Sequence, residues 1–203
     1  MSRPTTIAVG VTGASGSIYA VRTMAALLEA GCRLEIVFSD YGRRLLMDEL
    51  GEQAKVDRLL DVLVERYGEG VRRGTFSVNS NKDMGAALAS GSHLCDAMVI
   101  VPCSMKTLAG VAHGLSRSLI ERAADVMLKE RRRLVLVPRE TPMSLPQLRN
   151  MVAAAEAGAM ILPAMPAFYQ KPQTIDDLAD FITGRILNAL GFEQQLFTPW
   201  KGE

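Results

Sequence analysis

The sequence predicts a doubly wound α/β fold, in which helices cover both faces of a parallel β-sheet. Short, continuously apolar runs alternate along the chain with longer amphipathic segments, which is the pattern of strand–helix–strand units. Glycine follows four of the five amphipathic segments, as expected where helices end. The 203 residues show no internal repeat and no linker-like stretch, so we expect one domain spanning residues 1–203.

The apolar runs are expected to be strands buried on both faces, because they are continuous rather than alternating. They are Ile7–Val11, Leu34–Phe38, Ala97–Val101, Leu134–Val137 and Met160–Leu162. The amphipathic segments are expected to be helices, namely Ile18–Ala30, Tyr41–Leu50, Ser116–Arg133, Ser144–Ala157 and Ile175–Leu190. Ser116 and Thr174 are candidate N-caps. Residues 52–75 show a helical pattern only in Val56–Arg66. This order indicates a Rossmann-like or flavodoxin-like sheet, in which ligands bind beyond the carboxyl ends of the strands.

Composition excludes several classes of function. With 23 basic and 22 acidic residues the net charge is +1, so no overall positive field holds a nucleic acid or an anionic membrane. No apolar run approaches the ~20 residues that a membrane span needs, and no signal peptide is expected. Three cysteines without CxxC spacing and two histidines indicate neither disulfides nor a metal site. We therefore expect a cytoplasmic protein that binds no metal.

The loop after the first strand is rich in glycine and precedes a helix. The sequence from Gly10 to Gly16, GVTGASG, allows a tight turn in which backbone N–H groups approach a phosphate or an aromatic ring system. A glycine-rich turn alone is a weak indication, but its place between a strand and a helix favours a ligand site. After the second strand, Ser39 suits a phosphate or ribityl hydroxyl, whereas Asp40 is explained as an N-cap; together they favour a mononucleotide.

Later loops add further candidates. Ser104 and Thr107 follow the third strand, where their hydroxyls and the amides of a new helix suit an anion or a flavin; for Ser104, a plain N-cap is the alternative. Arg139 follows the fourth strand and is placed for a bidentate phosphate contact. The proline-rich loop 163–172 follows the fifth strand and presents Tyr169.

Three basic residues fall on predicted helices: Arg122, Lys129 and Arg185. Arg122 and Lys129 are seven residues apart and so share one helix face, where both can point at one anion. An ordinary solvated face is the simpler explanation, and the spacing alone favours it.

Longer motifs resemble the UbiX-type flavin prenyltransferases over most of the chain, from about Ile7 to Trp200. The resemblance rests on GVTGASGSIYA, NSNKDMGAALASGS, MVIVPCSMKTLAGVAHGLS, LIERAADVMLKERRRLVLVPRETPMS and PAMPAFYQKPQTIDDLADFITGRILNALG. PCSMKT and RETP are specific to this family rather than to flavin-binding sheets in general.

The resemblance implies a metal-independent enzyme that joins the prenyl group of dimethylallyl phosphate to N5 and C6 of reduced FMN. The product, prenylated FMN, would go to a UbiD-type decarboxylase, for example in ubiquinone biosynthesis. It also implies a homo-oligomer, a dodecamer whose active sites lie where subunits meet.

Site residues follow from the same resemblance. Gly13, Ala14 and Ser15 match the flavin loop, with Ser15 near N5. The remaining FMN contacts are Ser39, Ser104, Met105, Lys106, Thr107 and Arg139. Tyr169 and Arg185 match contacts to the prenyl phosphate, and the polar groups around that phosphate are Arg122, Lys129, Glu49 and Glu140.

These residue types suit the implied reaction. Breaking an allylic C–O bond places negative charge on the phosphate, which Arg122, Lys129, Arg139 and Arg185 would stabilise. Tyr169 and Trp200 would shelter the positive prenyl carbon. A proton must leave C6, and Glu49, Glu140 or the released phosphate could accept it; the sequence does not choose among them.

Other functions remain as alternatives. A flavin-dependent decarboxylase of related fold would use an early histidine and a PASANT-like segment, where this chain has PCSMKT and no histidine before His93. Direct decarboxylation of an aromatic acid would need an electron sink beyond flavin. A short-chain dehydrogenase needs Tyr-x-x-x-Lys, which none of the four tyrosines begins. A non-catalytic FMN carrier would leave Glu49 and the helix cations without a task.

Overall fold

The computed structural model of the chain, described for residues 3–198 and 200, contains a six-stranded parallel sheet. Its strand order is β3-β2-β1-β4-β5-β6, which is doubly wound and confirms the predicted fold class. The strands are β1 (Thr6–Val11), β2 (Arg33–Phe38), β3 (Thr75–Ser80), β4 (Ala97–Cys103), β5 (Arg133–Pro138) and β6 (Met160–Ile161). The winding direction reverses between β1 and β4, and this switch point is where such sheets bind ligands.

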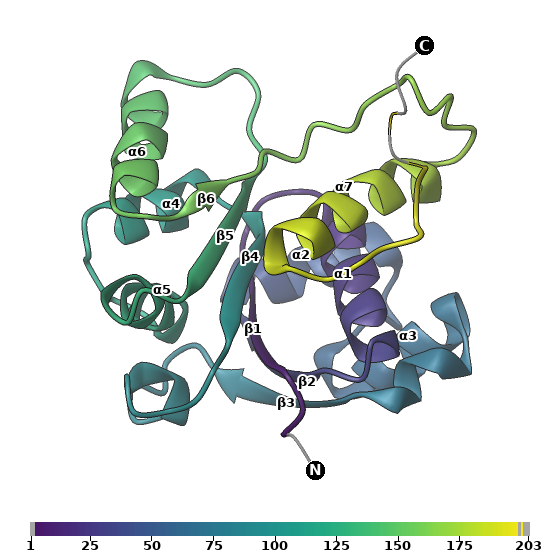
Figure 1. Cartoon of the computed structure of the whole chain (residues 1–203), viewed down its shortest axis with the longest axis horizontal. Coiled ribbons are helices and arrows are strands. Elements are labelled where there is room, and N and C mark those ends of the chain that lie inside the picture. The colour runs from purple at the N-terminus through teal and green to yellow at the C-terminus, as the bar shows by residue number, and fades with distance from the viewer. Residues whose placement is uncertain (1–2, 199, 201–203) are drawn as a thin grey trace.

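Helices cover both faces of the sheet (Figure 1). On one face lie α1 (Ser17–Glu29), α2 (Asp40–Leu50), α3 (Leu59–Tyr67) and α7 (Ile175–Leu190). On the other lie α4 (Met105–Ala112), α5 (Leu119–Lys129) and α6 (Leu145–Glu156). Short 3₁₀ turns are η1 (Val56–Arg58), η2 (Glu69–Arg73) and η3 (Ala87–Ala89). Among the described residues, no helix is both long and apolar enough to cross a membrane.

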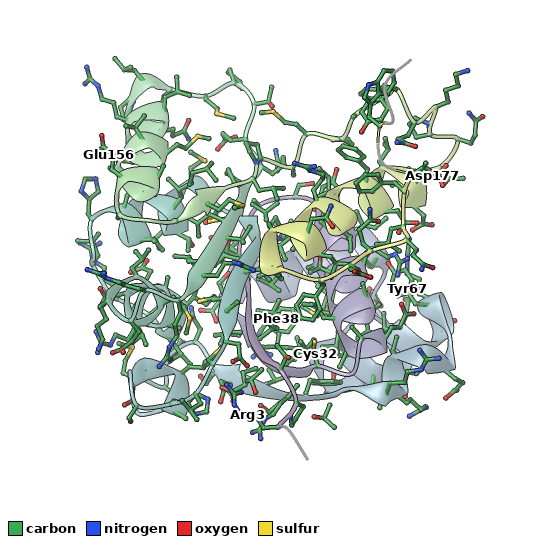
Figure 2. All side chains as sticks on the ribbon, in the orientation of Figure 1. Arg3, Cys32, Phe38, Tyr67, Glu156 and Asp177 are labelled. Carbon is green, nitrogen blue, oxygen red and sulfur yellow. The ribbon has the colours of Figure 1, made fainter. Side chains whose placement is uncertain are left out.

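The central strands are buried on both faces, as their continuous apolar runs predict. Val9 and Val99 pack under α1 and α7, whereas their neighbours Ala8 and Met98 pack under α4 and α5. Phe38, at the end of β2, is among the largest fully buried side chains, while Glu156 and Asp177 lie at the surface (Figure 2). The two cores hold the sheet rigidly, so the loops at its carboxyl edge are fixed in position.

Helix ends follow the local sequence signals. Ser39, Ser104 and Thr174 are N-caps whose side chains accept backbone N–H bonds. Glycines with left-handed or otherwise positive φ follow the predicted helices, namely Gly31, Gly51, Gly158 and Gly191.

One predicted helix was too long, and one strand was not predicted. The predicted helix Ser116–Arg133 is shorter, because Ser116 has φ 48° and Ser118 is the actual N-cap of α5, accepting from the N–H of Glu121 at 3.4 Å. Strand β3 was not predicted, because its residues are polar or half-exposed at the sheet edge and lack a continuous apolar run.

Candidate active site

The loops after β1 and β4 are joined at the switch point by the side chain of Thr12. Its hydroxyl donates to the carbonyl oxygen of Pro102 at 2.9 Å and accepts from the N–H of Ser104 at 2.7 Å. Thr12 is 1% exposed, so these bonds are protected from water. The hydroxyl of Ser104 in turn donates to Thr107 Oγ1 at 3.0 Å. The glycine-rich loop and the PCSMKT segment therefore form one rigid unit, with the N-terminus of α4 beside the loop.

Helix α2 approaches the end of β1 closely because glycine occupies the two contact positions. A Cβ on Gly13 would lie 2.6 Å from Cβ of Tyr41, and a Cβ on Gly42 would lie 2.5 Å from the carbonyl oxygen of Val11. Ser39 accepts from the N–H of Gly42 at 3.0 Å. The N-terminus of α2 thereby comes to lie next to the glycine-rich loop.

A cavity of about 410 Å³, here called the Ser39 cavity, lies where the N-termini of α2 and α4 meet. It is lined by Gly13, Ser39, Asp40, Tyr41, Asn81, Ser104, Lys106, Thr107, Arg117, Ser118 and Glu121. Five of these were predicted as flavin contacts. Among these predicted residues, the N-termini of α2 and α4, the hydroxyls of Ser39, Ser104 and Thr107, and the ammonium group of Lys106 suit a phosphate.

A second cavity, of about 660 Å³ and here called the Ser15 cavity, lies on the other side of the glycine-rich loop. Its lining residues are Ser15, Gly16, Ile18, Tyr19, Glu49, Leu50, Arg66, Arg139, Ala164, Ile175 and Asp176. Arg139 donates its Nε–H to the carbonyl oxygen of Ser15 at 3.0 Å, which fixes the guanidinium against the loop. Predicted residues Ser15, Glu49 and Arg139 are thus brought together.

Glu49 accepts hydrogen bonds from the first backbone N–H groups of α1. One carboxylate oxygen is 2.7 Å from the N–H of Ser17 and 3.0 Å from that of Gly16. Partial burial acts to raise the pKa of Glu49, but these bonds, with contributions from the Ser15 and Ser17 side chains, outweigh it and lower the pKa. Glu49 is therefore held as a carboxylate beside Ser15.

Arg122 contacts the segment before β4 rather than either cavity. Its Nε–H donates to the carbonyl oxygen of Ala89 at 3.1 Å, and its Nη1 lies 2.6 Å from the carboxylate of Asp125. Arg132 holds the same segment through the carbonyl oxygens of Gly91 and His93, both at 2.7 Å. These two arginines explain how the NSNKDMGAALASGS segment is fixed on α5.

Lys129 lies at the far end of α5, where its Nζ is 2.8 Å from a carboxylate oxygen of Glu130. Arg185 is exposed on α7 between the buried residues Gly184 and Ile186. Arg122, Lys129 and Arg185 line neither the Ser39 cavity nor the Ser15 cavity. Within one chain, the predicted cations do not converge on a single anion.

Tyr169 and Trp200 meet, as a shared aromatic role requires, but outside the two cavities. Their ring centroids are 5.4 Å apart at 82°, and Tyr169 also contacts Phe181 of α7 edge to face at 6.0 Å. Both residues are exposed, Tyr169 by 47% and Trp200 by 67%. Tyr169 and Trp200 therefore form an exposed aromatic surface on which a ligand or another chain can pack.

Three predicted residues lie close to the site without lining either cavity, and one of them, Ala14, is a buried residue of the glycine-rich loop. Met105, the first residue of α4, is buried in the core and lines neither cavity. Glu140 accepts from the N–H of Thr141 at 3.2 Å and from the side-chain amide of Gln147 at 3.4 Å. Its carboxylate is thus turned toward α6.

The sequence interpretation missed several residues that the fold brings to the cavities. Asn81, Arg117 and Glu121 line the Ser39 cavity, and Arg66, Tyr19 and Asp176 line the Ser15 cavity. Arg66 lies in a segment without a motif, and Asp176 lies in a family motif that assigns it no site role. Only the packing of α3 and α7 on α1 brings the two residues together. Thr12 lies inside the GVTGASG motif, where its linking role was not predicted.

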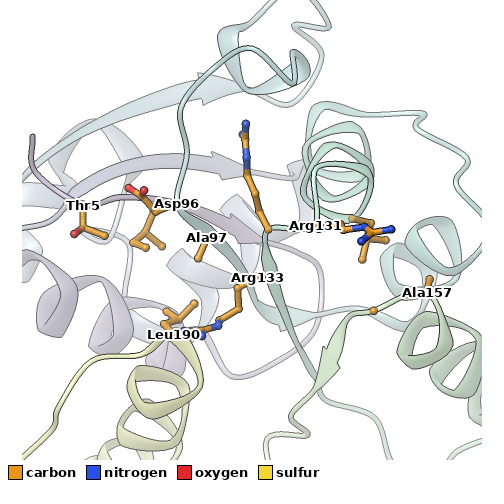
Figure 3. A pocket seen from close by; sticks show the side chains of 11 residues that line it. Thr5, Asp96, Ala97, Arg131, Arg133, Ala157 and Leu190 are labelled. Carbon is orange, nitrogen blue, oxygen red and sulfur yellow. The ribbon is translucent and has the colours of Figure 1, made fainter.

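A third cavity, of about 710 Å³, lies at the opposite edge of the sheet (Figure 3). Residues at the amino ends of β1, β4 and β5 line it, together with the ends of α5, α6 and α7. Helix C-termini carry partial negative charge, and Arg131, Arg132 and Arg133 offset it there. Ligand sites of doubly wound sheets lie at the carboxyl edge, so this cavity is not the candidate site.

FMN fits the residues at the carboxyl edge. The Ser39 cavity supplies N–H groups, hydroxyls and Lys106 for a phosphate, and the exposed backbone at Gly13 leaves room for close approach. Ser15 and Arg139 then lie on the far side of the same loop, where polar groups would face the ring system. Among residues 3–198 and 200, no group of three or more His, Cys, Asp or Glu side chains is placed to hold a metal ion.

Comparison with known proteins agrees with this geometry. The family model described as Flavoprotein matches residues 1–187. A curated relative from Halalkalibacterium halodurans, named flavin prenyltransferase UbiX, is 46% identical over 96% of this chain and 93% of its own length.

Two solved structures share the fold closely. The structure of AnUbiX (PadA1) in complex with FMN and dimethylallyl pyrophosphate has a TM-score of 0.88 and 38% identity, covering 99% of this chain and all of the other. A dodecameric FMN-dependent UbiX-like decarboxylase from Escherichia coli O157:H7 has a TM-score of 0.86 and 36% identity, covering 97% of this chain and all of the other.

Proposed function

The chain belongs to the family of UbiX-type flavin prenyltransferases, and from this premise we propose that it transfers a dimethylallyl group from dimethylallyl phosphate to N5 and C6 of reduced FMN. The observation that carries the proposal is the junction of the GVTGASG loop with PCSMKT at the switch point, with Ser15, Glu49 and Arg139 around one cavity. The product is prenylated FMN.

Flavin binding is assigned to the loops at the carboxyl edge. Backbone groups of Gly13 and Ala14 contact the flavin, and Ser15 orients N5. The phosphate and ring contacts are Ser39, Ser104, Met105, Lys106, Thr107 and Arg139; for Met105, whose side chain is buried, the contact is its backbone. Reduced flavin supplies the nucleophilic positions.

Transfer breaks the allylic C–O bond of the donor, so phosphate leaves with negative charge while the prenyl carbon becomes positive. Lys129, Arg185 and Arg122 stabilise the departing phosphate together with Arg139. Tyr169 and Trp200 shield the prenyl carbon from water, and their edge-to-face pair supports a shared role. Glu49 moves the C6 proton, supported by its ionised state, and Glu140 is the second candidate.

The active site is completed by neighbouring copies of the chain. Lys129 and Arg185 lie away from Arg139 within one chain, and a dodecamer with shared sites would supply them from adjacent subunits. We place the protein in the cytoplasm as one domain of residues 1–203, with a UbiD-type decarboxylase receiving its product, as in ubiquinone biosynthesis. Three free, buried cysteines suit a reducing compartment.

The test is anaerobic mixing of the protein with reduced FMN and dimethylallyl phosphate, followed by mass analysis of the flavin. The expected result is a five-carbon addition. The Lys129→Ala variant should bind FMN but make no product, and Ser15→Ala should turn over more slowly. Incubation with an aromatic acid tests direct decarboxylation. Release of CO₂ without flavin modification would contradict the transferase proposal and indicate a decarboxylase.

A further inference from the structure

Arg66 is a cation of the Ser15 cavity that no family motif covers. It lies in the last turn of α3, and its Nη2 donates to Oδ1 of Asp176 in the first turn of α7 at 2.9 Å. Its guanidinium carbon is 5.8 Å from the centre of the Tyr67 ring. The side chain is 35% exposed and lines the cavity. These contacts hold the guanidinium at the cavity wall without covering it.

The charges around the cavity favour an anion. Arg66 and Arg139 face Glu49 and Asp176, so the formal charges balance. However, Glu49 is bonded to the N-terminal N–H groups of α1, and Asp176 lies in the first turn of α7, so a helix dipole offsets part of each negative charge. Arg139 bonds only an uncharged carbonyl oxygen, so its positive charge is not offset by that contact, whereas Arg66 shares the partly compensated charge of Asp176.

The remaining wall of the cavity is apolar. Ile18, Leu50, Ala164 and Ile175 supply it, and Ile175 is 70% exposed although it begins a helix that otherwise buries its apolar face. A volume of about 660 Å³ lies within the usual range for small-molecule sites. A ligand with a short branched hydrocarbon chain and a phosphate matches this lining: the chain suits the apolar residues, and the phosphate suits the two guanidinium groups.

We propose that Arg66 binds the phosphate of the prenyl donor in the Ser15 cavity, next to Arg139, while the apolar wall contacts the five-carbon chain. The inference rests on the proposed function and adds a donor-binding residue to it. Asp176 is then a positioning residue, because its carboxylate orients the Arg66 guanidinium and competes with the phosphate for it.

The experiment measures KM and kcat for dimethylallyl phosphate, with calorimetric titration of inorganic phosphate into the FMN-loaded protein. Arg66→Gln should raise KM by about tenfold and weaken phosphate binding to a similar extent, since one charge-assisted hydrogen bond is lost. Arg66→Lys should recover part of this loss. FMN affinity should stay unchanged in all variants.

Asp176→Asn separates anion binding from a purely structural tie between α3 and α7. It breaks the same ion pair but leaves Arg66 charged, so KM should be equal to or lower than that of the unmodified chain. Arg58→Gln is the matched control, because Arg58 forms an exposed ion pair with Asp61 outside the cavity, and KM should not change.

Three outcomes would overturn the inference: an unchanged KM in Arg66→Gln, equal KM increases in Arg66→Gln and Asp176→Asn, or loss of FMN binding with Arg66. Failure of the unmodified chain to add a five-carbon unit would instead contradict the proposed function. The phosphate titration distinguishes the two, since it requires no turnover.

Discussion

Thr12 joins the two loops that form the candidate site through the two hydrogen bonds of its hydroxyl group. Thr12→Val keeps the shape but leaves the N–H of Ser104 and the carbonyl oxygen of Pro102 with one partner fewer in a buried position. We expect a loss of roughly 1–3 kcal/mol in the free energy of unfolding and weaker FMN binding. Urea denaturation and flavin titration measure these effects.

Thr23→Val is the matched control for this substitution. Thr23 is also fully buried, but its hydroxyl is 3.5 Å from that of Thr183, at the limit of a hydrogen bond. It should lose less stability and leave FMN affinity unchanged. Equal effects in both variants would show that the Thr12 bonds have no special role.

Glu49 links stability to pH through its bonds to the start of α1. Its folded-state pKa is lowered, so its stabilising contribution is present above the unfolded pKa, about 4.3, and is lost as pH falls through the folded value. Glu49→Gln should lower stability at pH 7 by about 1 kcal/mol or less, because the site is partly exposed. The difference from the unmodified chain should shrink below about pH 4.

Denaturation of both proteins across this pH range tests the linkage. Glu52→Gln, an exposed change in the turn after α2, should alter stability little at any pH. A stability difference for Glu49→Gln that does not vary with pH would mean that the carboxylate charge is not what stabilises α1.

At the scale of elements, the close packing of α2 on the end of β1 depends on Gly42. Alanine there would gain about 1 kcal/mol of helix propensity, but its Cβ would lie 2.5 Å from the backbone oxygen of Val11. Because backbone atoms cannot rotate away, we expect Gly42→Ala to be destabilised overall by about 1–3 kcal/mol and to bind FMN more weakly.

Gly70→Ala serves as the comparison, since its Cβ would meet only the flexible Glu29 side chain, at an ordinary 3.4 Å. It should change stability by no more than about 0.5 kcal/mol. A Gly42→Ala protein as stable as Gly70→Ala would mean that α2 can move outward without cost.

The elements that could be predicted from sequence are those whose apolar pattern and capping residues agree with their burial in the fold. Strands β1, β2, β4 and β5 have continuous apolar runs because both faces are buried, and α7 has a clear cap at each end. Strand β3 could not be found, since the edge of the sheet permits Ser77 and Asn79 in it. The start of α5 was misplaced because Ser116, two residues before the true N-cap Ser118, resembles it.

The loops of the candidate site could be predicted for the same reason: a motif after a strand is carried to the carboxyl edge by topology alone. Ser39, Ser104 and Arg139 needed no knowledge of packing. Arg66 and Asp176 meet because α3 and α7 both pack against α1, which no local pattern encodes. Whether the helix cations converge depends on contacts outside one chain, so their shared role stays a prediction.

For the whole molecule, mixing two inactive variants tests whether subunits share a site. Lys129→Ala and Arg185→Ala should each be inactive alone. If a site takes these residues from different subunits, reassembled mixtures should regain up to about a quarter of the activity. Turnover after co-refolding measures this, with each variant refolded alone as the control. No recovery in a correctly assembled mixture would contradict site sharing between these residues.

The parallel sheet also gives the chain an uneven charge distribution, which the net charge of +1 does not reveal. Every strand points the same way, so each crossover helix begins at the carboxyl edge, and the amide dipoles add up along one direction. The chain is thus electrically polarised although almost neutral. At low salt, this polarity should steer phosphorylated ligands toward the carboxyl edge before they bind. Added salt should therefore lower their association rate more than expected for a protein with a uniformly spread net charge of +1.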